Sequence, residues 1–168
     1  MRKQRGFSLI ELLIVVAIIL VIAAIAIPNL LRSRIAANES SAVGSLRTIN
    51  SAEILYVTAY PATGFAIALG ELGPGATGTC PSTPTTATAC FLDKVLGCST
   101  AMSGGQTCAK DGYNFSVTTP GNYPETFYQS NASPISPQTG TRYFYSDASA
   151  VIRYNTTISA TSADSPLQ

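Results

Sequence analysis

Histidine is absent from the 168 residues of this chain. Its absence excludes a histidine general base, a histidine metal ligand and a histidine pH switch. Charge is also scarce, because 11% of the residues are charged and 46% are hydrophobic, whereas soluble domains average about 25% charged. Ten Lys and Arg against nine Asp and Glu leave a net charge of +1. We therefore expect no specific nucleic-acid partner, since such a partner calls for a strongly cationic face.

Motifs for enzyme or metal chemistry are also lacking. The acidic residues after position 60 are too dispersed to form a pair of catalytic carboxylates; they are Glu71, Asp93, Asp111, Glu125, Asp147 and Asp164. Asp111-Gly112 and Asp147 belong to no D-x-D-x-D calcium loop. We therefore expect no catalytic residue, no metal and no cofactor, and we expect that the chain is not an enzyme.

Four cysteines, Cys80, Cys90, Cys98 and Cys108, lie within 29 residues of one another. They contain no Cys-x-x-Cys pair, which argues against a four-cysteine zinc site. An even number of cysteines in an exported domain favours two disulfides and an oxidising compartment. Sequence leaves all three pairings open, and our preference is for the two local bridges, Cys80–Cys90 and Cys98–Cys108.

The amino-terminal segment places a long apolar run behind a short basic one. Residues 1–6 carry three cations and no acid, a pattern that holds this end in the cytoplasm. From Phe7 to Ile27, only Ser8 and Glu11 are not apolar. As a helix this segment spans about 31 Å, which matches a hydrocarbon core of about 30 Å. We therefore expect a helix that crosses the membrane once.

A cleavable secretory signal is the alternative reading of this segment, because Ala24-Ile25-Ala26 imitates an A-x-A cleavage site. The apolar run is longer than the roughly 7–15 residues of such a signal. Glu11 also argues against it, since an ionised carboxylate in lipid costs a few kcal/mol. A permanent helix that later pairs this carboxylate with a cation would offset that cost, whereas a cleaved signal would not. The remaining reading is that Glu11 only reaches the polar interface near the helix end.

These residues carry a resemblance to a known family. GFSLIELLIVVAIILVIAAIAIPNLLRSR resembles the amino terminus of type IV pilins and of the pseudopilins of type II secretion, and the match covers about the first 60 residues. The shared pattern is a short basic leader, Gly6, Phe7, Glu11, an apolar helix and Pro28. The resemblance implies that a prepilin peptidase removes the leader 1–6 between Gly6 and Phe7 on the cytoplasmic face. It also implies that the new amine of Phe7 is methylated.

Cleavage at this point would leave an amine four positions from Glu11. In a bundle of such helices, the carboxylate of one subunit reaches the amine of the next, so two charges that are costly alone form a pair in a low-dielectric core. Such a pair fixes the axial register between neighbours. The family assigns the same assembly role to the glutamate at this position.

Pro28 is expected at the outer edge of the membrane, where we place a helix break because proline removes a backbone donor. The alternative is that Pro28 begins a new helix at its first turn. The organisation expected is a membrane and filament-core helix at 7–28, an amphipathic helix at 29–60 and a head at 61–168 with a disulfide region at 80–108. Val43, Leu46, Ile49, Ile54, Tyr56 and Val57 supply the apolar face of the second helix. Glu39 falls on its polar face and Glu53 at a solvated edge.

The head is predicted to be α+β, with three or four antiparallel strands packed on the long helix. Tyr113, Phe115 and Val117 alternate with polar residues, as in a half-buried strand. Further strands are expected at 142–145 and 151–154, with another inside 122–130. Gly and Pro between positions 61 and 89 exclude a long helix there. Many pilins carry their disulfide near the carboxyl terminus, and this chain does not, which leaves the pilin subclass open.

Taken together, the sequence predicts a structural pilus subunit. The resemblance implies an inner-membrane subunit with a cytoplasmic amino terminus that is later assembled into an extracellular helical homopolymer. Its implied partners are the prepilin peptidase, an assembly platform with its ATPase, and other subunits. A type II secretion pseudopilin is the first alternative, and a minor pilin that primes assembly is another. A monomeric, signal-anchored periplasmic binding domain or enzyme is the alternative from a different class.

Overall fold

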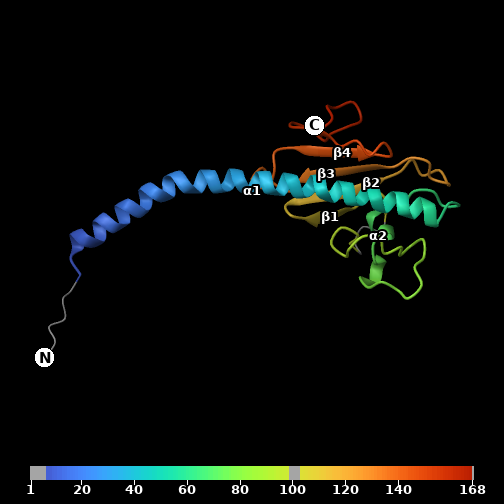
Figure 1. The fold of residues 1–168 in the computed structure, drawn as a ribbon, viewed down its shortest axis with the longest axis horizontal. Coiled ribbons are helices and arrows are strands. Elements are labelled where there is room, and N and C mark those ends of the chain that lie inside the picture. The colour runs from blue at the N-terminus through green and yellow to red at the C-terminus, as the bar shows by residue number, and fades with distance from the viewer. Residues whose placement is uncertain (1–6, 99–102, 168) are drawn as a thin grey trace. The chain divides into compact units, whose positions relative to one another are not determined.

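A 51-residue helix, α1 (Leu9–Ala59), opens the fold in the computed structural model, which describes residues 7–98 and 103–167 (Figure 1). Contacts divide the chain into two compact units, one ending at Arg34 and the other beginning at Ile35, and α1 contributes to both. Within the described ranges, α1 is the one helix long and apolar enough to cross a membrane. The expected leader residue Gly6 lies outside the described residues.

Pro28 lies inside α1, and the helix is continuous on both sides of it. No new helix therefore begins at Pro28, and the loosening expected there stays a prediction. The side-chain amide of Asn29 donates to the carbonyl of Ile25 at 3.2 Å. This bond brings a side-chain donor to the carbonyl next to that of Ala24, the one that loses its helical donor at Pro28.

The head contains one antiparallel sheet in the order β1-β2-β3-β4-β5. Its strands are β1 (Thr107–Lys110), β2 (Tyr113–Thr118), β3 (Gln129–Pro134), β4 (Tyr143–Asp147) and β5 (Arg153–Asn155). Asp111 and Gly112 join β1 to β2 with φ angles of 47° and 80°, the left-handed conformations that a two-residue hairpin turn requires. Between α1 and β1 the described part of the chain forms α2 (Leu69–Leu72) and a 3₁₀ turn, η1 (Gly75–Thr77), and no other helix or strand.

The α+β prediction is confirmed, although the sheet has five strands instead of three or four. The strand around Phe115 is confirmed as β2, whose residues alternate between buried and half-buried positions. The segments expected at 142–145 and 151–154 correspond to β4 and β5. The strand expected inside 122–130 is largely wrong, because β3 begins only at Gln129. β1 was not predicted.

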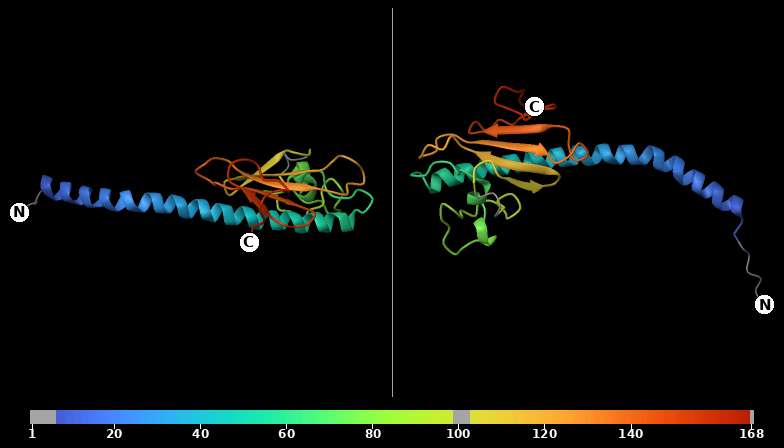
Figure 2. Two further views of the ribbon diagram at one scale, coloured as in Figure 1. Left: turned by 90° about the horizontal axis from the view of Figure 1, so that it is seen from above. Right: turned by 180° about the vertical axis from the view of Figure 1, so that it is seen from behind.

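The sheet packs along one side of the carboxyl-terminal part of α1 (Figure 2). The helix residues in this core are spaced three or four apart: Ala42, Leu46, Ile49, Ala52 and Tyr56. The sheet and the residue just before β3 supply mainly aromatic side chains: Tyr113, Phe115, Val117, Tyr128, Ala132 and Phe144. Ile54, expected on the apolar face, is 52% exposed, because it lies two residues before Tyr56 and turns away from the sheet.

Both local disulfides that the sequence analysis preferred are present, Cys80–Cys90 and Cys98–Cys108. Each joins cysteines ten residues apart, with Cα atoms 5.9 Å and 5.7 Å apart. The first closes an exposed loop. The second ties the segment at Cys98 to β1, and Cys108 lies in the core at 1% exposure. The two bridges therefore constrain a region in which the described residues, 80–98 and 103–106, form no helix or strand before β1.

Candidate functional site: the amino-terminal helix and its head

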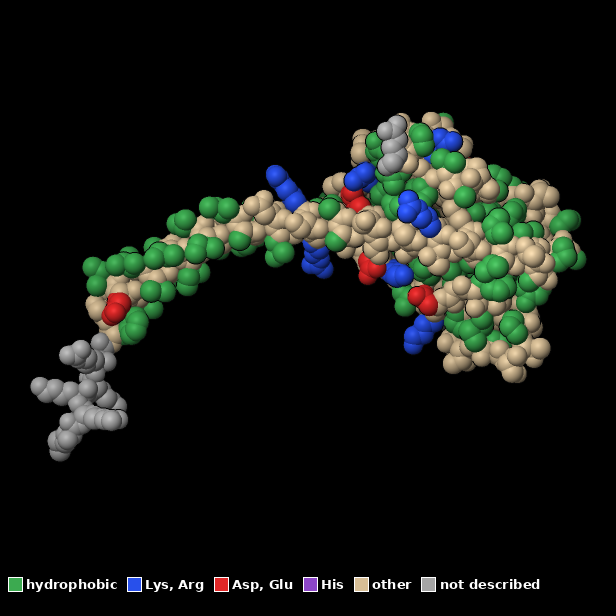
Figure 3. Space-filling view, in the orientation of Figure 1, with side chains coloured by type: hydrophobic (Ala, Val, Ile, Leu, Met, Phe, Trp, Pro, Cys, Tyr) green, Lys and Arg blue, Asp and Glu red, His purple; other side chains and the backbone are tan. Residues whose placement is uncertain are grey.

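The first unit exposes an unusually large apolar surface (Figure 3). Seventeen large apolar side chains of this unit are exposed: Phe7, Leu9, Ile10, Leu12, Leu13, Ile14, Val15, Val16, Ile18, Ile19, Leu20, Val21, Ile22, Ile25, Ile27, Leu30 and Leu31. Soluble monomers rarely expose contiguous apolar patches above a few hundred Å². A helix that is apolar all round requires lipid or other helices as its surroundings.

Glu11 is the acidic residue within this apolar surface. It lies in the first turn of α1 and is exposed, and Phe7 precedes the helix by two residues. The described residues form one ion pair, between Glu39 and Arg142. No described residue therefore forms an ion pair with Glu11. The positive end of the helix dipole favours a carboxylate at this position. The expected pair joins Glu11 of one subunit to the Phe7 amine of another. The structure contains one chain, so this pair stays a prediction.

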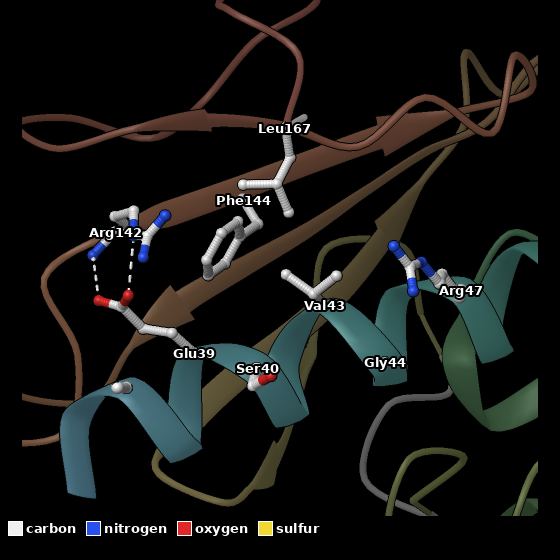
Figure 4. Close-up of a pocket in the computed structure, with 9 residues that line it drawn as sticks. Glu39, Ser40, Val43, Gly44, Arg47, Arg142, Phe144 and Leu167 are labelled. Carbon is white, nitrogen blue, oxygen red and sulfur yellow. Dashed lines mark hydrogen bonds and ion pairs between the residues drawn. The ribbon is translucent and has the colours of Figure 1, made fainter. Parts of the chain in front are cut away.

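In the head, Glu39 fixes α1 to the loop before β4 (Figure 4). Its carboxylate accepts a hydrogen bond from the Arg142 Nε at 2.7 Å. It also accepts hydrogen bonds from the backbone N–H and the hydroxyl of Thr141, at 3.0 and 2.9 Å. Burial raises the pKa of Glu39, but the hydrogen bonds and the Arg142 charge outweigh burial and hold the pKa below its ordinary value. The expected place of Glu39 on a solvated polar face is therefore wrong, because its partners come from more than 100 residues away.

Glu53 is a second buried acid of α1, fully covered at 0% exposure. Its Oε2 accepts a hydrogen bond from the backbone N–H of Ala66 at 2.9 Å, and its Oε1 has no hydrogen-bond partner among the described residues. Burial raises the pKa of Glu53 to about 8, the Ala66 bond opposes this shift, and the nearby charge of Glu71 adds to it. The solvated edge expected for Glu53 is wrong, because residues 64–72 fold over this part of the helix.

A cavity of about 330 Å³ lies beside the Glu39–Arg142 pair (Figure 4). Val43 of α1 faces Phe144 and Leu167 across it, and Arg47 lies at one end. Glu39 and Arg142 already satisfy one another. Within the described part of the chain, no group of three or more His, Cys, Asp or Glu residues is placed to hold a metal ion. The side chains that line this cavity therefore suit packing better than catalysis or metal binding.

Comparison with known proteins adds information about the amino-terminal segment above all. Residues 1–27 match the family model described as the prokaryotic N-terminal methylation motif. No solved structure matches the chain.

Three curated relatives illustrate the range of similarity. The chain is 60% identical over 40 residues to the type IV wide pilus major component PilA4 of Thermus thermophilus, a stretch covering 24% of this chain and 30% of that protein. It is 47% identical over 51 residues to the type IV major pilin protein PilA of Myxococcus xanthus, covering 30% and 23% of the two chains. It is 34% identical over 86 residues to the type II secretion system core protein G of Dickeya chrysanthemi, covering 49% and 52%.

The matched stretches thus span about half or less of each relative. The names of these relatives denote structural components of pili and of a secretion system, not enzymes. The motif match covers the beginning of the exposed apolar helix described above. The chain carries the prepilin-type amino-terminal segment shared by type IV pilins and type II secretion pseudopilins.

Proposed function

We propose that this chain is a structural, major-pilin-like subunit of a type IV pilus. The inner membrane holds the subunit through α1 before assembly, with the amino terminus in the cytoplasm. Assembly then moves the apolar helix from lipid into a bundle of identical helices, and the head forms the filament surface. The observation that carries the proposal is the exposed apolar helix, which begins within a prepilin-type motif and whose Glu11 forms no ion pair with any described residue.

Maturation prepares the helix for this exchange. A prepilin peptidase cuts between Gly6 and Phe7 and methylates the Phe7 amine, while an assembly platform with its ATPase drives extraction. Removing residues 1–6 deletes three cations and leaves one amine. In the bundle, Glu11 of one subunit pairs with the Phe7 amine of its neighbour and sets their register, because each charge alone is costly in an apolar core. Pro28 is the position at which α1 would loosen on packing, since one helical hydrogen bond is already missing there.

A type II secretion pseudopilin is the second candidate function. The observation favouring it is the match to core protein G of Dickeya chrysanthemi, which extends over 86 residues where the pilin matches extend over 40 and 51. A pseudopilus is a short fibre confined to the cell envelope, and its subunits are absent from material sheared off the cell surface. The candidate from a different class, an anchored monomeric binding domain or enzyme, predicts neither cleavage after Gly6 nor filaments.

The deciding experiment is intact-mass analysis of material sheared from cells. A type IV pilin gives abundant filaments whose subunit begins at a methylated Phe7 and retains both disulfides. The same analysis of the membrane fraction is the control, because the subunit awaiting assembly carries the same mature terminus. A mature chain that begins at Ile27 would mean secretory signal cleavage and would contradict the proposal. A correct terminus found only in membranes would transfer the chain to the pseudopilin class.

A further inference from the structure

Two cavities adjoin on the side of the sheet that α1 does not cover (Figure 2). One, of about 240 Å³, is lined by residues of β2, β3 and β4 and by Ser159. The other, of about 360 Å³, lies between the β3–β4 connection and the chain after β5. Tyr143 of β4 lines both cavities, so they meet at this residue. We call the two cavities together the outer groove.

Strand alternation turns the polar side chains of the outer groove away from the core. Four polar side chains on or beside the strands line it: Ser116, Asn131, Ser133 and Tyr143. Each is next in sequence to a residue buried in the core that includes α1, namely Phe115, Ala132 or Phe144. Because successive side chains of a strand point to opposite faces of a sheet, the four project to the face away from this core. The register of β2 and β3 places Ser116 directly opposite Asn131.

The polar atoms of these four side chains are free and within reach of a ligand. All four residues are half-buried, and their side chains have no hydrogen-bond partner among the described residues. None of their atoms belongs to the fully buried polar atoms that lack a partner, so each keeps contact with solvent. Thr156 and Ser159, both exposed, add hydroxyl groups from the chain after β5. The groove thus presents hydroxyl and amide groups that paired strands hold in place.

The outer groove is also uncharged. Among the described residues, no Lys, Arg, Asp or Glu lines either cavity. The charged residues of β5 and the segment after it are engaged with each other's segments, because the Arg153 guanidinium donates to the Asp164 carbonyl at 2.9 Å and the Asp164 carboxylate accepts from Asn155 at 2.8 Å. An ionised ligand in the groove would lose water without gaining a counter-charge, so the lining favours a neutral ligand.

We infer that the outer groove binds a neutral oligosaccharide of six-membered sugar rings. Sugar hydroxyls donate and accept hydrogen bonds, as do the hydroxyl and amide groups of this lining. The Tyr143 ring, where the cavities meet, offers an apolar surface to the C–H face of a sugar ring. Pro134, Ile135 and Pro137 add apolar surface in the larger cavity. Ligand sites typically combine such apolar walls with a few placed polar groups.

An extended peptide fits this groove less well. A peptide strand gains affinity by bonding to a free sheet edge, and β2, β3 and β4 are each paired on both sides. The binding site is a property of one head. Its presentation by a filament rests on the proposed function, because the sheet face away from α1 looks outward only if α1 forms the filament core.

The first test uses the full chain, labelled with ¹⁵N, in micelles of a phosphocholine detergent, which contains no sugar. The chain is titrated with maltotriose, cellotriose and mannotriose, which share the chemistry and differ in stereochemistry, and NMR follows the backbone amides. We expect saturable shifts with at least one of these sugars. The largest shifts should lie at Ser116, Asn131, Ser133 and Tyr143.

Three variants locate the interaction. Tyr143→Leu removes the aromatic surface and should weaken binding about tenfold or more. Asn131→Ala removes an amide that bonds the sugar and should weaken binding by about two- to tenfold. Phe127→Leu changes an exposed aromatic side chain outside the groove, so it should leave the affinity unchanged. Amide shifts outside the groove that match those of the parent show that each variant is folded.

The absence of saturable shifts with all three sugars overturns the inference, as does equal affinity of the parent and both groove variants. Tighter binding of the anionic trigalacturonate than of any neutral sugar also overturns it. Sheared filaments then test the presentation of the site: filaments of the parent should bind the same trisaccharide, and filaments of the Tyr143→Leu variant should bind it about tenfold more weakly. Filaments that bind no sugar would overturn the outward placement. A chain that forms no filaments but binds the sugar in micelles contradicts the proposed function and supports the site.

Discussion

The Glu39 carboxylate, on α1, lies 2.7 Å from the Arg142 Nε, although the two residues are 103 positions apart. Glu39 is nearly covered, whereas Arg142 is 39% exposed and lies 5.6 Å over the Tyr154 ring. Partial exposure of the arginine weakens the pair through solvent screening. Thr141 donates two further hydrogen bonds to the Glu39 carboxylate, and these do not involve Arg142. These contacts fix the carboxyl-terminal part of α1 to the loop before β4.

Glu39→Gln should destabilise the head by about 1–3 kcal/mol, because the amide accepts fewer hydrogen bonds and cannot pair with Arg142. The pKa of Glu39 is lowered in the folded state, so its contribution is complete above the ordinary value of 4.5 and is lost as the pH falls through the depressed folded pKa. Urea unfolding of the full chain in micelles at a series of pH values measures both effects. The difference between parent and variant should shrink below pH 4.5.

Asp111→Asn is the matched control for this prediction. Asp111 is an exposed acid that accepts the Ser41 hydroxyl at 2.6 Å, and it bridges the same helix to the β1–β2 turn. Asparagine keeps an acceptor and tolerates the left-handed backbone there, so the change should stay within about 0.5 kcal/mol. An equal loss in both variants would show that net charge, not the Glu39 contacts, stabilises the head.

Glu53→Gln should have the opposite effect on stability. The folded pKa of Glu53 is raised to about 8, so the folded head binds a proton that the unfolded chain releases above its ordinary value of 4.5. The parent therefore loses stability as the pH rises from 4.5 to 8, while glutamine keeps an acceptor for Ala66 without titrating. The variant should be more stable by about 2–4 kcal/mol at pH 8 and equal to the parent at pH 4. Denaturant unfolding at the two pH values measures the difference, and a gain that is the same at both would contradict this account.

Sequence patterns identified those parts of the fold that depend on local alternation. β2 was predictable because Tyr113, Phe115 and Val117 alternate with polar residues along it. β3 was not, because its sequence QSNASP has low strand propensity and its buried members are only Ser130 and Ala132. The missed β1 had a usable signal in Asp111-Gly112, a typical two-residue hairpin turn that was considered only for its acid.

The buried acids were mispredicted for a different reason. Helical periodicity places Glu39 and Glu53 on faces of α1, but burial depends on what packs there. Thr141 and Arg142 reach Glu39 from across the head, and the backbone of Ala66 reaches Glu53 after the chain reverses direction. Glu11 is the extreme case, because the partner proposed for it belongs to another copy.

The two disulfides should differ in their contribution to stability although each joins cysteines ten residues apart. Loop closure alone predicts about 2–3 kcal/mol for either bridge. Replacing Cys98 and Cys108 by serine also places a hydroxyl at the fully buried position 108, which adds about 1–3 kcal/mol. Replacing Cys80 and Cys90 changes an exposed loop and serves as the matched control. Urea unfolding under oxidising conditions should rank the Cys98–Cys108 variant as the less stable, and the reverse order would contradict the core role of Cys108.

Glu11→Gln tests the central assembly step. The amide is nearly isosteric and less costly in lipid than a carboxylate, so membrane insertion and cleavage after Gly6 should continue, and the membrane fraction should still contain a chain that begins at methylated Phe7. Without the carboxylate, each neighbour's amine enters the apolar bundle unpaired, at a cost of several kcal/mol per subunit. Sheared filaments should therefore fall by about tenfold or more. Ser8→Ala, a change at the other non-apolar position of the same segment, should leave filament yield unchanged. Normal yield and helical register from the Glu11→Gln subunit would contradict the proposed pairing, because register would then arise from the apolar surfaces alone.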